Sequence, residues 1–88
     1  MLNFTRVKSQ NFYIAVAPNK TILLRSYNTI VGIYDHNTNE LHRARYTHTT
    51  GKQITKWSPE DAKNIYVSQD KLKEIIKDKT NLIVNTNY

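Results

Sequence analysis

Three histidines, His36, His42 and His48, are spaced at six-residue intervals and are the side chains best suited to acid–base chemistry. An imidazole exchanges its proton near neutral pH, so His42 or His48 with Lys52 could serve as the general acid and base of a small nuclease. Six-residue spacing puts no two histidines on one helix face, and the chain has no cysteine. The pattern therefore does not match a metal site, and we expect no bound metal.

Residues needed for the common catalytic motifs are scarce. The only glycines are Gly32 and Gly51, so there is no glycine-rich phosphate loop, and no Gly-x-Ser-x-Gly motif occurs. The adjacent acids Glu60 and Asp61 follow Ser58-Pro59, an arrangement typical of a helix start. We therefore expect a protein that is not an enzyme and holds no cofactor, and a nuclease is the weakest of three functional hypotheses.

The cationic residues are concentrated in one part of the chain. The 88 residues contain 13 Lys and Arg against 7 Asp and Glu, a formal net charge of +6. Residues 1–57 hold eight of the cations but only two acids, whereas the remainder is balanced. Such a field favours an anionic partner, either a phosphate backbone or an acidic protein surface. The alternative is a basic surface that only maintains solubility.

Aromatic residues are interleaved with these cations. On one open face of a sheet, tyrosines could stack on unpaired bases while arginines and lysines hold phosphates or carboxylates. The predicted binding residues are Arg25, Arg43, Arg45, Lys52, Lys56, Tyr13, Tyr34 and Trp57. In the alternative interpretation a short helix covers this face, and the arginines extend past the edge of that helix.

The elements that would position these side chains form one α+β domain over residues 1–88. Four segments rich in β-branched and aromatic residues are separated by short turns, which predicts an antiparallel sheet of about four strands within residues 12–46. These segments are residues 12–17, 21–25, 29–35 and 40–46. Residues 2–8 are a candidate edge strand.

Helix signals follow Tyr46. Thr50-x-x-Gln53 fits a capping box and predicts a short helix with Ile54 and Trp57 on one face. Ser58-Pro59 predicts a second helix start.

The C-terminal helix has the strongest pattern. It is predicted to open at Ser68-Gln69-Asp70 and to carry an apolar stripe of Leu72, Ile75 and Ile76. Residues 65–67 are a candidate short edge strand. The tail from Asn81 either docks one more strand or frays.

Alternation along the strands predicts two faces. The predicted core face, covered by the C-terminal helix, holds Phe12, Ile14, Val16, Ile22, Leu24, Val31, Ile33, Ala44 and Tyr46. The predicted opposite face holds Tyr13, Ala15, Ala17, Leu23, Arg25, Ile30, Gly32, Tyr34, Leu41, Arg43 and Arg45.

Two segments resemble short uncharacterised phage and plasmid proteins of bacteria. Residues 26–35 (SYNTIVGIYD) carry the Ser-Tyr-x-Thr strand of those proteins, and residues 46–57 (YTHTTGKQITKW) carry their Tyr-x-x-Thr-Thr loop and closing Lys-aromatic pair. Where that pattern has serine and histidine beside Lys52, this chain has Gly51 and Gln53. The resemblance implies a mobile-element origin and supplies no activity.

The leading hypothesis is a phage- or plasmid-type accessory protein that binds nucleic acid or a nucleic-acid-processing complex. A protein–protein inhibitor of a host factor, such as a defence system, is the alternative. The chain shows no signal peptide pattern and no run of about 20 apolar residues, so we expect a cytoplasmic protein without a membrane partner. Self-association as a homodimer would add buried apolar area to so small a core.

Overall fold

The computed structural model describes residues 2–8, 10–46 and 48–87, with the backbone alone for His48. The described residues form a single six-stranded sheet and two helices. In chain order the elements are β1 (Thr5–Arg6), β2 (Phe12–Ala17), β3 (Thr21–Ser26), β4 (Thr29–Asp35), β5 (Glu40–Arg43), α1 (His48–Trp57), β6 (Lys63–Tyr66) and α2 (Gln69–Thr80). This confirms the α+β class. In the described residues no helix is both long enough and apolar enough to cross a membrane.

The strands lie in the sheet in the same order as in the chain. Each pair from β1 to β5 is antiparallel, as the short predicted turns require. The sixth strand differs, because β6 pairs parallel with β5 after the chain has crossed over through α1. The prediction of about four strands was therefore too low, and it missed the parallel pair. The candidate edge strands within residues 2–8 and 65–67 are present as β1 and as part of β6.

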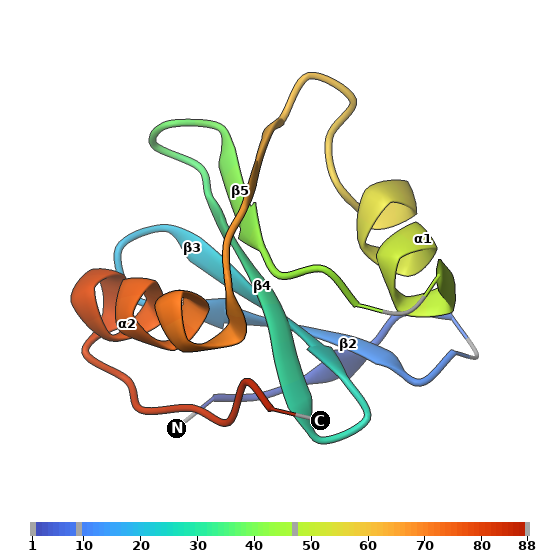
Figure 1. Ribbon diagram of the computed structural model, residues 1–88, viewed down its shortest axis with the longest axis horizontal. Helices are drawn as coiled ribbons and strands as arrows, with labels where there is room; N and C mark the ends of the chain where they lie inside the picture. Colours follow the sequence, from blue (N-terminus) through green and yellow to red (C-terminus); the bar gives the residue numbers. More distant parts are fainter. Residues whose placement is uncertain (1, 9, 47, 88) are drawn as a thin grey trace.

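The two helices cover opposite faces of the sheet, which gives three layers (Figure 1). On the α1 side, Ile54 and Trp57 pack on the sheet. The buried residues of that cluster are Phe12, Leu24, Val31, Tyr34, Leu41, Ile54 and Ala62. On the α2 side, Leu72 and Ile76 pack on a second cluster. Its other buried residues are Ala17, Leu23, Ile30, Ile33 and Ala44.

A β-bulge in β4 explains why the predicted faces were partly wrong. Leu24 pairs with Gly32 but Arg25 pairs with Ile30, so one extra residue, Val31, lies between the two pairs. The extra residue reverses the alternation, so Ile30 and Ile33 share the α2 side although they are three positions apart. Next to the bulge the neighbours pack closely on Gly32. A Cβ atom at this position would lie 3.3 Å from both the Leu24 side chain and the His42 carbonyl oxygen.

Three further placements correct the predicted faces. Tyr34 and Leu41 lie on the same side as Phe12, under α1, and not on the opposite face. The C-terminal helix covers the other face, around Leu23. Val16, predicted to lie in the core, is 79% exposed, because burial on the α1 face of β2 decreases from Phe12 through the half-buried Ile14 to Val16.

Two predicted helix starts were also wrong. Helix α1 begins at His48, so Thr50 lies inside its first turn, buried with its hydroxyl 3.5 Å from that of Ser26, and does not cap it. Ser58-Pro59 begins a turn closed by a hydrogen bond from the Ala62 N–H to the Pro59 carbonyl oxygen, 3.1 Å. The next residues pair with β5, which ends the turn before a helix can grow.

Helix α2 confirms its prediction. The Ser68 hydroxyl caps the helix by accepting a hydrogen bond from the Lys71 N–H at 3.1 Å. Asn81 ends it in the left-handed conformation. The following tail docks beside β4, where the Ile30 N–H donates to the Asn85 carbonyl oxygen at 2.8 Å and Thr86 is fully buried.

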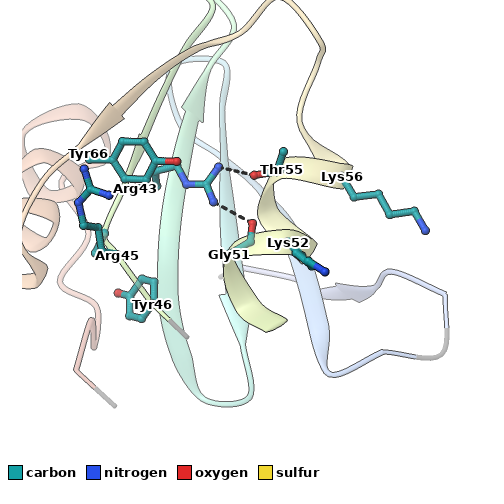
Figure 2. A pocket seen from close by; sticks show the side chains of 9 residues that line it. Arg43, Arg45, Tyr46, Gly51, Lys52, Thr55, Lys56 and Tyr66 are labelled. Atoms are coloured by element: carbon teal, nitrogen blue, oxygen red, sulfur yellow. Dashed lines mark hydrogen bonds between the residues drawn. The ribbon is translucent and has the colours of Figure 1, made fainter. Parts of the chain in front are cut away.

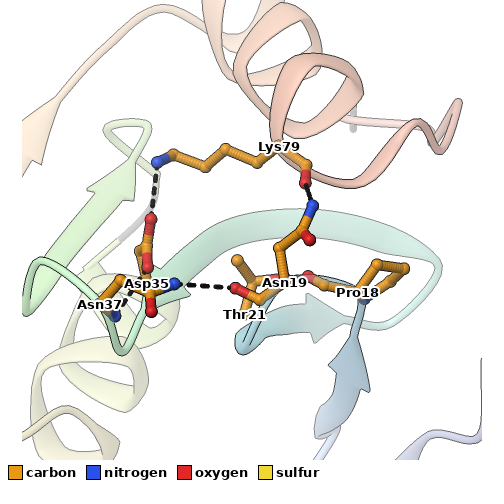
Figure 3. A network of polar contacts seen from close by, with 6 residues as sticks. All are labelled: Pro18, Asn19, Thr21, Asp35, Asn37 and Lys79. Carbon is orange, nitrogen blue, oxygen red and sulfur yellow. Dashed lines mark hydrogen bonds and ion pairs between the residues drawn. The ribbon is translucent and has the colours of Figure 1, made fainter.

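A polar network joins two strand turns to the end of α2 (Figure 3). The Lys79 ammonium donates to a carboxylate oxygen of Asp35 at 2.8 Å, and the Asn19 amide donates to the Lys79 carbonyl oxygen at 2.6 Å. The Asn37 backbone N–H donates to the other Asp35 oxygen at 2.8 Å. Burial alone would raise the pKa of Asp35, but the hydrogen bonds from Lys79 and Asn37 and the lysine charge hold the pKa below its usual 3.8.

Replacing Lys79 by methionine should lower the free energy of unfolding at pH 7 by about 1 kcal/mol. This is less than the value of about 1.5–3 kcal/mol typical of hydrogen bonds to charged groups, because the lysine is partly exposed. A carboxylate with a lowered native pKa stabilises the fold above its unfolded-state pKa, and this stabilisation is lost as the pH falls through the native value. The difference between wild type and variant should therefore shrink below about pH 3.8.

Urea denaturation between pH 7 and pH 3 measures this difference. Lys73→Met, at an exposed position of the same helix, is the matched control and should change stability little at either pH. An equal loss in both variants would show that the Asp35–Lys79 pair contributes nothing specific.

Candidate functional site

The parallel pairing of β5 and β6 positions the candidate site. Arg43 at the end of β5 is the register partner of Tyr66 at the end of β6, so their side chains are neighbours. Between these strands the chain passes through residues 44–46 and then α1, which packs over the same side of the sheet. The ends of two strands and one face of a helix therefore surround a single groove (Figure 2).

Arg43 lies at the floor of this groove and is only 3% exposed. Its Nη1 donates to the Thr55 hydroxyl at 3.0 Å and to the Asn64 side-chain oxygen at 3.1 Å. Its Nη2 donates to the Gly51 carbonyl oxygen at 2.8 Å. One guanidinium therefore ties β5, α1 and β6 together, as the dashed bonds to α1 in Figure 2 show in part.

Among the described residues no carboxylate neutralises the charge of Arg43. All three acceptors are uncharged, and Nε is buried without a hydrogen-bond partner. In the described part of the chain the one ion pair is that between Asp35 and Lys79. Burial lowers the pKa of the Arg43 guanidinium, with the nearby Tyr66 phenol acting in the opposite direction, yet an arginine stays charged at neutral pH. The groove floor thus carries a positive charge for which the described part of the chain supplies no counter-ion.

Tyr66 forms a stack with two arginines at the same place. The Arg43 guanidinium carbon lies 5.1 Å from the centre of the Tyr66 ring, and that of Arg45 lies 4.5 Å from it, both within cation–π range. Figure 2 shows the ring flanked by the two guanidinium groups. Arg45 is exposed and Tyr66 is 47% exposed, so this stack forms one wall of the groove and is open to solvent.

The groove has a volume of about 570 Å³, within the range of small-molecule sites. Its lining residues are Arg43, Ala44, Arg45, Tyr46, Gly51, Lys52, Thr55, Lys56 and Tyr66. Every formally charged member of this lining is cationic. Lys52 and Lys56 stand on α1 at the rim, and in Figure 2 the Lys56 side chain extends away from the guanidiniums.

A second cavity adjoins the first. It has a volume of about 370 Å³ and shares Ala44, Arg45 and Tyr66 with the groove. The Arg45–Tyr66 stack therefore stands between two neighbouring cavities, the second of which extends to Ser68 and Gln69 at the start of α2.

The structure separates two of the predicted binding residues from the groove. Arg25 and Tyr13 are paired across β2 and β3, and the Arg25 guanidinium is stacked between the rings of Phe4, at 4.4 Å, and Tyr13, at 4.3 Å. Arg6 adds a hydrogen bond to the Tyr13 hydroxyl at 3.2 Å. This second cluster, Phe4, Arg6, Tyr13 and Arg25, lies away from β5 and β6.

Tyr34 is packed in the core beneath α1, and the partly buried Trp57, the last residue of α1, packs against that core. Tyr34 is 5% exposed, and its ring meets that of Trp57 edge-on with centroids 6.0 Å apart. Neither residue lines the groove, and stacking of a base on Tyr34 would require the core to open. Of the eight predicted residues, the structure brings together Arg43, Arg45, Lys52 and Lys56.

Of the two acid–base pairs considered for a nuclease, His42 with Lys52 is not brought together. Leu41 faces α1, so the alternating His42 faces α2, where burial and the charge of Lys79 lower the pKa of its imidazole. Lys52 lies on α1, across the sheet from His42. The His48 side chain lies outside the described part. Among the described residues no three His, Cys, Asp or Glu side chains are placed to hold a metal ion.

Sequence reasoning missed Tyr66, Tyr46, Thr55 and Gly51 as parts of the groove. Tyr66 was assigned to a candidate edge strand, but the alternation pattern contains no signal that this strand pairs parallel with β5. Only that pairing makes Tyr66 a neighbour of Arg43.

The chain belongs to DUF8033, a family of unknown function, whose model matches residues 3–74. The matched region contains the whole groove and ends within α2. Searches of the curated proteins and of the solved structures find no match.

Replacing Arg43 by lysine should lower the free energy of unfolding by about 2 kcal/mol. A lysine keeps the charge but cannot make the planar set of three hydrogen bonds that joins Gly51, Thr55 and Asn64. Thermal and urea denaturation measure the loss. Arg45→Lys, at the exposed partner of the same stack, should stay within about 0.5 kcal/mol of wild type. Equal stability of the two variants would contradict a structural role for the Arg43 hydrogen bonds.

Proposed function

We propose that this member of the DUF8033 family is a non-catalytic accessory protein that binds nucleic acid through the groove between α1 and the ends of β5 and β6. The observation that carries the proposal is the buried Arg43 guanidinium without a counter-ion, at the floor of a groove whose charged lining is entirely cationic. The phage- or plasmid-type origin is part of the proposal and rests on the sequence resemblance alone.

The charge arrangement supports a phosphate ligand. Arg43, Arg45, Lys52 and Lys56 supply four positive charges around one cavity. A buried charge is costly when it has no partner, and an anion that enters the groove would supply the missing counter-ion. Phosphate groups fit because guanidinium groups bind their oxygens through paired hydrogen bonds, while lysines at the rim act as flexible point charges.

The aromatic wall supports a nucleic acid over a simple anion. Bases stack on tyrosine rings and on the flat faces of arginine guanidiniums. Arg45 is already held against Tyr66, so a base that stacks here meets an ordered platform and not a free side chain. Stacking of this kind contributes about 1–3 kcal/mol per base and does not depend strongly on sequence. We therefore expect modest sequence preference.

The proposal predicts salt-dependent binding that depends on the groove. A variant with Arg45→Gln, Lys52→Gln and Lys56→Gln should bind a fluorescent single-stranded oligonucleotide about 10- to 100-fold more weakly than wild type, because three phosphate-binding charges are removed. The slope of log affinity against log salt should also become shallower by about 0.7 per lost contact. Fluorescence anisotropy at several salt concentrations measures both quantities.

The matched control removes three charges elsewhere. This variant carries Lys71→Gln, Lys73→Gln and Lys77→Gln at exposed positions of α2. It loses the same number of positive charges as the groove variant and should weaken binding much less. Equal weakening in both triple variants would indicate a diffuse charge effect and not a groove. If the wild type binds no oligonucleotide at low salt, the proposal fails, and an acidic protein surface becomes the candidate partner.

A further inference from the structure

We propose that the groove holds the terminal phosphate of an unpaired nucleic-acid strand, with Arg43 contacting the phosphate and the first base stacking on the Arg45–Tyr66 wall. This inference rests on the proposed function and narrows it to one class of ligand, a strand end that carries a phosphate monoester.

The unused hydrogen-bonding capacity of Arg43 is the starting point. Its Nε–H has no partner, and its Nη2 makes one hydrogen bond with two hydrogens available. These two nitrogens share one edge of the guanidinium plane, the kind of edge that binds two oxygens of a phosphate. The other hydrogens are already committed to α1 and β6. Arg43 is thus fixed in place by one set of bonds and retains another edge for a ligand.

The depth of Arg43 selects which phosphate can reach it. The guanidinium is 97% buried, and the half-exposed Tyr66 ring lies beside it, with its centre 5.1 Å from the guanidinium carbon. A ligand therefore has to insert a protruding group beside this ring to reach the guanidinium. An internal phosphodiester is linked to a sugar on both sides, whereas a terminal monoester is linked on one side only. A terminal phosphate can therefore reach Arg43 at the groove floor with only one attached sugar to accommodate.

The charge of a monoester also suits the site better. Near neutral pH a phosphate monoester carries between one and a half and two negative charges and three free oxygens. An internal phosphodiester carries one charge on two free oxygens. Arg43 needs a counter-ion for itself, and Lys52 and Lys56 can reach a shared ligand from the rim because their side chains are flexible.

The second cavity offers a continuous path for the nucleotides that follow the strand end. The two cavities share Arg45 and Tyr66, so a strand whose end sits over Arg43 can pass the stack and continue towards the start of α2. Its first base would then lie beside the Arg45 guanidinium. In a duplex the terminal bases are paired and stacked on each other, so a blunt end cannot place one base on this wall without opening the pair.

Competition binding with matched oligonucleotides tests the inference. A labelled single strand is displaced by the same sequence carrying a 5′-phosphate, a 3′-phosphate or hydroxyl ends, and by a hydroxyl-ended strand one nucleotide longer, which controls for added charge. A strand phosphorylated at one of its ends should compete about tenfold better than both hydroxyl-ended strands. A 5′-phosphorylated blunt duplex should gain much less from its phosphate.

The pH provides a second readout on the unmodified protein. The second ionisation of a phosphate monoester has a pKa of about 6, whereas an internal phosphodiester does not titrate in this range. The advantage of the phosphorylated strand should therefore decrease between pH 7.5 and pH 5. An advantage that is the same at both pH values would contradict recognition of the dianion.

A variant pair assigns the effect to Arg43. Arg43→Lys should abolish the preference for phosphorylated ends, while Arg25→Lys, in the second cluster, should keep it. If Arg43→Lys does not fold, the wild-type competition still decides the question.

Equal competition by phosphorylated and hydroxyl-ended strands overturns the inference but leaves the proposed function standing. Competition by a nucleoside monophosphate as strong as by the phosphorylated strand overturns the assignment to a strand end, and failure to bind any oligonucleotide overturns the proposed function as well.

Discussion

The parallel pairing of β6 with β5 is the constraint on which the rest of the structure depends. Antiparallel neighbours need only a tight turn, but two adjacent parallel strands need a crossover that returns the chain to the same end of the sheet. Helix α1 is that crossover, so it must lie over one face and bury a surface there. The face left on the other side is then available to α2 and the docked tail. Three layers and a groove at the crossover follow from one pairing.

Arg43 stabilises the contact between α1 and the sheet and is also the central residue of the proposed binding groove. An apolar residue at this position would pack under α1 without cost, so a buried cation without a carboxylate is an expensive choice for packing alone. The guanidinium recovers part of that cost through hydrogen bonds to three neutral acceptors on two other elements. Because the same group lines the groove, any ligand that neutralises it would also strengthen the junction of α1 with the sheet. In the proposed function, ligand binding and local rigidity are therefore coupled through a single side chain.

The local elements could be predicted from the sequence, and the long-range arrangement could not. Alternation and turn residues placed β2 to β4 nearly to the residue, and the Ser68 cap with its apolar stripe placed α2. The faces were mispredicted because a bulge at Val31 adds one residue to β4, which no propensity signals. The site was only half predicted, because the sequence carries no signal for the parallel pairing of β6 with β5. Arg43, Arg45, Lys52 and Lys56 meet because of the crossover. Arg25 instead lies between Phe4 and Tyr13, and the bulge places Tyr34 in the core under α1.

The two margins of the sheet have a consequence for behaviour at high concentration. A long open margin offers a row of unpaired amides and carbonyls to a neighbouring molecule and is a common origin of aggregation. Here the outermost strands are β1, with two residues, and β6, with four, one of which is a lysine. Such short edge strands present few unpaired backbone amides and carbonyls in a row. The charge of Lys63 also opposes pairing with the edge strand of a second molecule. The fold can therefore keep an open six-stranded sheet without inviting fibril-like growth.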